Sequence, residues 1–168
     1  TDLLINTPNI TINSRQVSRV EMEKALEQQE LDIVIDVLTP TSNDIRSTLI
    51  CNESFSLICR QGHPILNELT LENYIKASHA LVALKDSRVD LVDMALANHG
   101  ATRNIVLQCE HYFAATSVIS RCDMLLTMPN AYANLLKEKM PVEVVPLPFE
   151  VPVLPVHMYW HKQAEHDP

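Results

Sequence analysis

The sequence predicts an α/β protein of two lobes, and three patterns lead to that fold class. Residues 9–35 contain a strand-like run, a helical run and a second strand-like run, which imply a parallel sheet with a right-handed crossover. Helical and strand-like runs continue to alternate over 69–139. Two extended segments, 48–60 and 141–155, suit chain crossings between the lobes.

The first strand–helix–strand unit has recognisable ends. A strand over 9–13 has its two isoleucines on one face. Ser18 and Glu21 have the spacing of a capping box, which predicts that a helix begins there. The run 31–35 is almost continuously apolar, so we expect a strand buried on both faces.

Turn residues divide the middle of the chain into further elements. A turn at 61–64 ends the first extended segment, because Gly62 permits unusual backbone angles and Pro64 cannot continue a strand. The next strand and helix are separated by Asp86 or Ser87, expected to cap a helix that runs to about His99. The elements expected here are helices over 69–77, 87–99, 111–121 and 130–139, and strands over 79–84, 105–107 and 124–128.

The composition changes after Met140, where five prolines fall among valines. Each proline removes an amide donor, so we expect neither a central strand nor a helix in this stretch. A last strand over 156–160 is expected to return to the sheet of lobe one. The lobes predicted from these crossings are lobe one, 1–56 plus 147–168, and lobe two, 57–146.

Composition bounds the class of protein. The 168 residues are 46% hydrophobic and 20% charged, which is typical of a globular chain. A formal charge of -8 disfavours nucleic-acid binding by this chain itself, because phosphates are repelled. Two glycines are too few for the glycine-rich loops that bind dinucleotides or nucleoside triphosphates.

The compartment is predicted from what the chain contains. Four cysteines lie far apart without a CxxC pair, so we expect buried, reduced thiols. No apolar run approaches the ~20 residues of a membrane span, and the N-terminus has no signal-peptide pattern. A cytoplasmic domain with no membrane contact is the expectation.

Six short segments carry further information because of their order. They are ALEQQELDIVI at 25–35, LICRQGHP at 57–64, LTLE at 69–72, LLTMP at 125–129, VVPLP at 144–148 and YWHKQAEHDP at 159–168. Together they resemble the effector-binding domain of a LysR-type transcriptional regulator, from the branch that holds nodulation, aromatic-degradation and LeuO-like regulators. The resemblance covers nearly the whole chain.

The resemblance implies two Rossmann-like lobes with a cleft between them, as in type 2 periplasmic binding proteins. The family's domain begins with a strand and a helix that would precede Thr1, and a terminal helix would follow Pro168, so the chain resembles a truncated piece. DNA would be bound only through a helix-turn-helix domain that this sequence lacks. The resemblance implies a homodimer, and a tetramer for the full-length protein.

The resemblance also implies a small effector in the cleft, aromatic or carboxylated. The residues assigned to it are Ser18, Arg19, Leu38, Thr39, Leu84, Lys85, Cys109, His111, Tyr112, Phe113 and Thr127. His111 lies between a strand and a helix and can donate to a carboxylate, or it can cap the helix instead. Ser18 has a capping role as its alternative, and Lys85 can be simply solvated.

Catalytic and metal sites are not expected. His157 and His161 are four residues apart on a strand, about 13 Å, which is too far to share one zinc ion. The acidic pair Asp90 and Asp93 has the pattern of a solvated helix face. No nucleophile sits in a recognisable elbow, so we predict neither an enzyme nor a cofactor. A stand-alone solute-binding protein with the same cleft fold is the alternative.

Two apolar helix faces favour self-association. Met22 falls outside the stripe formed by Val20, Ala25 and Leu26, so the first helix has more apolar breadth than one buried face needs. The helix over 113–119 is similarly apolar. A two-fold dimer would bury both surplus faces.

Overall fold

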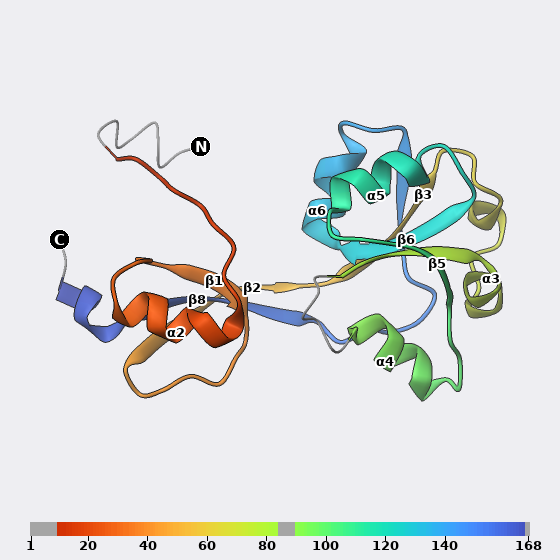
Figure 1. Ribbon diagram of the computed structural model, residues 1–168. Coiled ribbons are helices and arrows are strands. Elements are labelled where there is room, and N and C mark those ends of the chain that lie inside the picture. Colours follow the sequence, from red (N-terminus) through yellow and green to blue (C-terminus); the bar gives the residue numbers. More distant parts are fainter. Residues whose placement is uncertain (1–9, 84–89, 167–168) are drawn as a thin grey trace. The chain divides into compact units, whose positions relative to one another are not determined.

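The computed structural model describes residues 10–83 and 90–166 (Figure 1). The chain divides by contacts into two units. Unit 1 comprises Thr1–Val34, Thr41–Arg46 and Tyr159–Pro168, and unit 2 comprises Ile35–Pro40 and Ser47–Met158. The two units are described separately below.

Unit 1 is built around helix α2 (Arg19–Glu27) and the ends of three strands. The strands are β1 (Val34–Val37), β2 (Ile45–Glu53) and β8 (Leu154–His161), and they form a sheet in the order β1-β8-β2. The small core of this unit consists of Met22, Leu26, Ile45 and Tyr159.

Helix α2 presents a different face to this core from the one we expected. Met22 is 1% exposed and belongs to the core, whereas Val20 is 93% exposed. Met22 is four residues before Leu26, so the two side chains lie on one face of the helix. The prediction that Met22 is surplus apolar surface is therefore wrong, and Val20 is the exposed apolar residue instead.

The first expected strand is not formed in the described part of the chain. Residues 10–13 have no regular secondary structure, and both isoleucines are exposed. Strand β1 begins later than expected, and Ile33 and Ile35 are exposed rather than buried on both sides. The reason is that β1 is an edge strand, and Val34 packs on the core of α2 while its chain neighbours point the other way.

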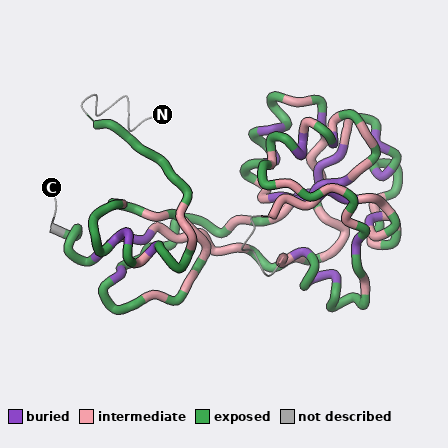
Figure 2. Tube along the Cα trace, viewed as in Figure 1, coloured by how far each residue is buried: buried purple, intermediate pink, exposed green. Residues whose placement is uncertain are grey.

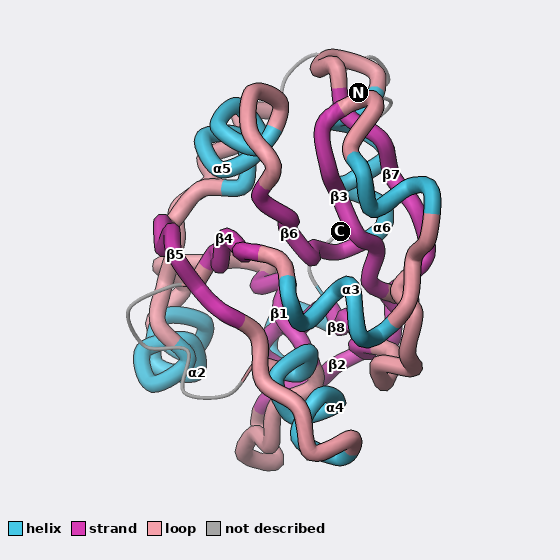
Figure 3. Tube along the Cα trace, turned by 90° about the vertical axis from the view of Figure 1, so that its right-hand side faces the viewer, coloured by secondary structure: helices cyan, strands magenta, loops and turns pink. Residues whose placement is uncertain are grey.

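Unit 2 contains a five-stranded mixed sheet in the order β5-β4-β6-β3-β7, which Figure 3 shows side by side. Strand β3 is antiparallel to β6 and β7, and β4 is parallel to β5 and β6. The strands are β3 (Phe55–Arg60), β4 (Ser78–Val82), β5 (Asn104–Cys109), β6 (Met124–Pro129) and β7 (Val142–Pro146).

Helices cover both faces of this sheet. The 3₁₀ helix η1 (Pro64–Asn67), α3 (Leu71–Lys76) and α4 (Leu91–Asn98) belong to one face, and α5 (Tyr112–Ile119) and α6 (Asn130–Lys137) to the other. A second 3₁₀ helix, η2 (Lys162–His166), follows β8. Because side chains alternate along a strand, Leu57 and Cys59 of β3 join one core while Ile58 joins the other. Figure 2 shows the resulting buried centre of this unit.

Most of the elements predicted between 69 and 139 are present with shifted ends. The start of α4 differs: it begins at Leu91, where the Asp90 carboxylate accepts from the backbone N–H groups of Val92 (2.8 Å) and Asp93 (3.1 Å). The expected caps, Asp86 and Ser87, lie outside the described residues. The helix ends as predicted, with Gly100 at φ +64° just beyond it.

The proline-rich stretch contains strands after all. Strand β7 is the edge strand beside β3, where a proline at the strand end is tolerated. Strand β8, in contrast, is the middle strand of its sheet and includes Pro155. The prediction that no central strand forms in this stretch is therefore wrong. Pro155 is the second residue of β8, and its carbonyl still accepts from the backbone N–H of Leu38 at 3.0 Å.

The four cysteines are free, but they are not uniformly buried. Cys59 lies in the core, and burial raises the pKa of its thiol to about 11. Cys51 is exposed, which corrects the expectation of four buried thiols; it lies on β2, whose side chains between Arg46 and Asn52 are exposed. Among the described residues no group of three potential ligands is placed to hold a metal ion. None of the helices in the described ranges has the length and apolar character to cross a membrane.

Candidate functional site

Three parallel strands of unit 2 end at the same edge of the sheet. Val82 of β4 pairs with Cys109 of β5, and the backbone N–H of Ala83 donates to the Cys109 carbonyl at 3.1 Å. On the other side of β4, Ala80 pairs with Leu126 of β6, the residue before Thr127. We call this border, at Val82, Cys109 and Thr127, the carboxyl edge.

The chain leaves the carboxyl edge in two directions. Helix α4 follows β4 and packs on one face of the sheet, whereas α5 follows β5 and packs on the other face. In open α/β sheets this divergence creates a crevice outside the strand ends, where small ligands commonly bind. The topology therefore makes the carboxyl edge the candidate ligand site of unit 2.

The predicted residues from Cys109 to Phe113 all lie at this edge. Cys109 is half-buried, and its Sγ is 3.7 Å from the His111 carbonyl oxygen. His111 is the N-cap residue of α5, but its exposed imidazole makes no capping hydrogen bond. Tyr112 is half-buried against Tyr132, with ring centroids 5.5 Å apart, and burial raises its pKa. Phe113 is exposed.

Thr127 is held from behind by a tyrosine that sequence reasoning missed. The Thr127 hydroxyl lies 2.8 Å from the hydroxyl of Tyr74, which is in the middle of α3 and fully buried. The Tyr74 ring also packs against the rings of Phe149 and His79, with centroid distances of 5.1 Å and 4.5 Å respectively. Tyr74 is 53 residues away from Thr127 in the chain, so no local pattern could have linked them.

A buried arginine continues this polar cluster. The Arg103 side chain is only 2% exposed, and its guanidinium pairs with Asp93 through Nε (2.7 Å) and with Asp90 through Nη2 (3.0 Å). The expectation that Asp90 and Asp93 form a solvated helix face is therefore wrong. Both carboxylates are partners of the buried Arg103 cation. A charge is retained in an interior only when it is paired in this way.

His79 completes the cluster on β4. It is fully buried, and its Nε2 lies 2.7 Å from the Tyr74 carbonyl oxygen. Desolvation by burial lowers the pKa of His79 to about 4, with the nearby Arg103 charge acting in the same direction. The imidazole is therefore neutral at pH 7, and Nε2 is the protonated nitrogen that donates to the carbonyl.

The remaining predicted residues lie elsewhere. Ser18 and Arg19 stand at the start of α2 in unit 1, and Arg19 is exposed. Leu38 and Thr39 follow β1; Leu38 is exposed, and the Thr39 hydroxyl donates to the Val37 carbonyl at 3.1 Å. Leu84 and Lys85 lie outside the described residues.

Ser18 has the capping role that was its alternative. Its backbone N–H donates to Glu21 Oε2 at 3.4 Å, and its hydroxyl donates to the same oxygen at 2.9 Å. We expect Ser18→Ala to lower the free energy of unfolding by about 1 kcal/mol, because a helix cap is lost. Urea denaturation would measure this. A matched Ser14→Ala variant, at an exposed position outside regular structure, should change stability by less than about 0.5 kcal/mol.

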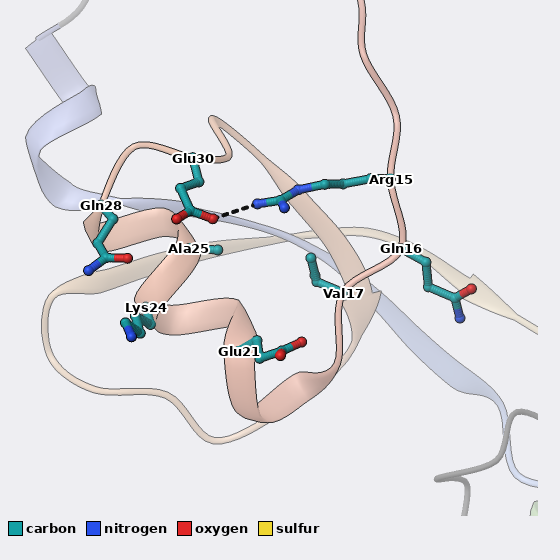
Figure 4. A pocket seen from close by; sticks show the side chains of 8 residues that line it. All are labelled: Arg15, Gln16, Val17, Glu21, Lys24, Ala25, Gln28 and Glu30. Atoms are coloured by element: carbon teal, nitrogen blue, oxygen red, sulfur yellow. Dashed lines mark hydrogen bonds and ion pairs between the residues drawn. The ribbon is translucent and has the colours of Figure 1, made fainter.

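Two shallow hollows in the structure lie away from the carboxyl edge. The first, of about 260 Å³, lies in unit 1 and is lined mainly by polar and charged side chains of α2 and of the residues on either side of it, with an Arg15–Glu30 ion pair of 2.8 Å (Figure 4). The second, of about 350 Å³, lies in unit 2 between the end of α4 and residues 150–152. Neither contains a residue predicted to bind the effector, and neither has a buried polar group pointing into it, so we assign no ligand to them.

Comparison with known proteins identifies the family. Residues 3–168 match the LysR substrate binding domain, and the chain belongs to that family. The chain is 26% identical over 161 residues to the HTH-type transcriptional activator NahR of Pseudomonas putida, covering 95% of this chain and 54% of NahR. It is 23% identical over 163 residues to the HTH-type transcriptional regulator LinR of Sphingobium indicum, covering 96% of this chain and 54% of LinR. The chain thus spans about half the length of these curated relatives.

Solved structures confirm the predicted α/β fold class. The regulatory domain of MexT, a transcriptional activator in Pseudomonas aeruginosa, superposes with a TM-score of 0.87 at 21% sequence identity. The match covers 99% of this chain and 83% of the MexT chain. The BenM effector binding domain with its effector benzoate superposes with a TM-score of 0.71 at 16% sequence identity. The match covers 95% of this chain and 73% of the BenM chain. The named relatives are regulators of transcription, which agrees with the prediction that the domain is not an enzyme.

Proposed function

We propose that this domain senses a small aromatic carboxylate at the carboxyl edge of unit 2 and thereby controls a LysR-type transcriptional regulator. The observation that carries the proposal is the divergence of α4 and α5 at this edge, where β5 and β6 end on either side of β4, near residues 109–113 and Thr127 respectively. The family membership supports it, as does a relative of the same fold that binds benzoate.

The side chains at the edge suit such a ligand chemically. The exposed His111 imidazole, free of a capping hydrogen bond, can donate to a carboxylate. Tyr112 and Phe113 offer aromatic surface against which a ring can pack. The Thr127 hydroxyl is a second polar group at the same edge. An aromatic acid matches the chemistry of these groups.

The remaining effector contacts, the lobe boundaries, DNA binding and dimerisation are proposed because the family resemblance implies them. Ser18, Arg19, Leu38, Thr39, Leu84 and Lys85 stay predicted effector contacts, and the lobe boundaries 1–56 plus 147–168 and 57–146 stay predicted. DNA would be bound through another part of the full-length protein. A homodimer also stays a prediction, with Val20 and Phe113 in place of Met22 as the exposed apolar residues on α2 and α5. Light scattering at tens of micromolar would test it, and a monomer mass would contradict it.

The sharpest test of the proposed site is His111→Ala. We expect the dissociation constant for benzoate, used as the probe, to rise about ten- to a hundredfold, because one hydrogen bond to a charged group is worth roughly 1.5–3 kcal/mol. Isothermal titration calorimetry measures the constant. The thermal midpoint without ligand should stay within about 2 °C, since the ring is exposed and makes no capping bond.

His99→Ala is the matched control. His99 is also an exposed histidine of unit 2 and is the C-cap residue of α4. Its ring centroid lies 6.4 Å from that of Phe149. Its replacement should leave the benzoate constant unchanged within about twofold. Equal effects of the two variants, or no effect of His111→Ala, would contradict the assignment of His111 to the ligand.

A further inference from the structure

We propose that Tyr74 and Arg103 fix the Thr127 hydroxyl as a hydrogen-bond donor at the carboxyl edge, so that the site selects an effector with an acceptor oxygen there. Neither Tyr74 nor Arg103 was predicted to touch the ligand, and both act from behind Thr127 as positioning residues. The inference rests on the proposed function in that it concerns the same edge and deepens its chemistry.

The first step is the contact between the two hydroxyls. Tyr74 and Thr127 lie 2.8 Å apart, and distance alone allows either to be the donor. Tyr74 is completely buried, so water cannot compete for its proton. Its single O–H must therefore point toward a protein acceptor, and the hydroxyl of Thr127 is the one within hydrogen-bonding distance among the described residues.

The second step is the charge of Arg103, which favours the direction that the burial of Tyr74 already requires. The pKa of Tyr74 is raised by burial, while the hydrogen bond to Thr127 and the charge and donor groups of Arg103 lower it, and the more weakly acting Asp90 raises it. A hydroxyl beside a cation turns its lone pairs toward the charge and its proton away. Nη2 of Arg103 also has no hydrogen bond of good geometry besides its ion pair with Asp90. The arginine charge thus acts in the same direction as burial, and Tyr74 donates to Thr127.

The third step concerns the free proton of Thr127. A threonine hydroxyl has one donor and two acceptor positions. If its oxygen accepts from Tyr74, its own proton is left to point elsewhere, and no other side-chain hydrogen bond of Thr127 is formed among residues 10–83 and 90–166. Thr127 is 9% exposed, so it is not closed off from solvent as completely as Tyr74 is. A carboxylate or carbonyl oxygen satisfies that proton, whereas a donor-only group does not.

The Asp90–Arg103–Asp93 cluster explains why this direction is stable. Asp93 Oδ1 accepts from Arg103 Nε at 2.7 Å, and Asp90 both pairs with Nη2 and caps α4. These contacts hold the guanidinium in one place without using the Tyr74 hydroxyl. The His79 side chain, neutral and bonded to the Tyr74 carbonyl, adds no competing charge.

A double-variant experiment with the benzoate probe tests the relay through Thr127. We expect Thr127→Val to weaken benzoate binding about tenfold and Tyr74→Phe about three- to tenfold, while Thr127→Ser retains most of the affinity. The decisive expectation is that Tyr74→Phe adds less than about twofold in the Thr127→Val background, because Tyr74 acts through Thr127 alone. Independent, multiplying losses are what a merely structural role of Tyr74 produces, and they would overturn the proposal. Tyr159→Phe, another fully buried tyrosine in unit 1, is the control and should leave the constant unchanged.

A ligand-free measurement separates this inference from the proposed function. In proton NMR of the unliganded chain, the Tyr74 hydroxyl proton should be protected from exchange and show a nuclear Overhauser effect to the Thr127 methyl group. Arg103→Met should shift this resonance, and Arg103→Lys should restore it in part. A protected hydroxyl proton on Thr127 that points at Tyr74 would overturn the inference while leaving the site intact. Failure of the wild-type chain to bind benzoate, with the Tyr74 proton as expected, would reject benzoate-like effectors and leave the donor assignment supported.

Discussion

Leu126→Ala is expected to lower the free energy of unfolding by about 3 kcal/mol, within the range of 2–5 kcal/mol measured for buried leucines. Leu126 lies in the interior strand β6 and is 0% exposed, in one core with Ile58, Met128 and Ala133. Strands on both sides of β6 and helices on its face leave little freedom to close the cavity. Urea denaturation followed by circular dichroism would give the difference in free energy.

Leu135→Ala is the matched control for this prediction. Leu135 is the same residue type in unit 2, but it lies on α6 and is 52% exposed. Its truncation should cost less than about 1 kcal/mol, because little apolar area returns to water. Similar costs for the two leucines would mean that the sheet core of unit 2 is not packed as described.

Acidification is expected to destabilise the chain through His79. Because burial lowers the pKa of His79 to about 4 in the folded state, the folded protein binds this proton less readily than the unfolded chain, whose histidine has a pKa of about 6.5. The stabilising contribution is complete above the unfolded pKa. It is lost as the pH falls from about 6.5 toward 4, and the loss levels off below that. Between pH 7 and pH 5 the cost is about 2 kcal/mol.

The variant His79→Gln isolates this contribution. Glutamine can donate an amide N–H toward the Tyr74 carbonyl, as Nε2 of His79 does, but it does not titrate. We expect the wild-type chain to lose about 2 kcal/mol more stability than His79→Gln between pH 7 and pH 5, measured by urea denaturation at each pH. His99→Gln, at an exposed position, should follow the wild-type curve. Parallel curves for wild type and His79→Gln would show that His79 is not buried in its neutral form.

Local sequence patterns located most of the secondary structure of unit 2. The turn at Gly62 and the end of α4 before Gly100 were read correctly, because both glycines have positive φ angles that other residues rarely adopt. The cap at Ser18 and the helix start after His111 were found in the same way. These features depend on residues within one turn of each other, so the local sequence contains all the information they need.

The same patterns failed where a long-range partner decides the outcome. The isoleucines of 10–13 alternate like those of a strand, but no partner strand pairs with them in the described structure, and they stay exposed. Met22 and Val20 are equally apolar, and only the packing of α2 on Tyr159 selects Met22 for the core. Pro155 is tolerated in a middle strand because of its position near the strand's start, which the residue type alone does not reveal.

The sequence by itself determined the fold class and the family resemblance, and the resemblance implied the candidate stretch from Cys109 to Phe113. These follow from hydrophobic periodicity and from short segments in a fixed order, which are properties of the chain read locally. Only the tertiary structure brought Tyr74 to Thr127 and paired the buried Arg103 with Asp90 and Asp93. The physical reason is that sheet order and register decide which distant side chains share one face, and burial then makes their charges and hydrogen bonds strong enough to matter.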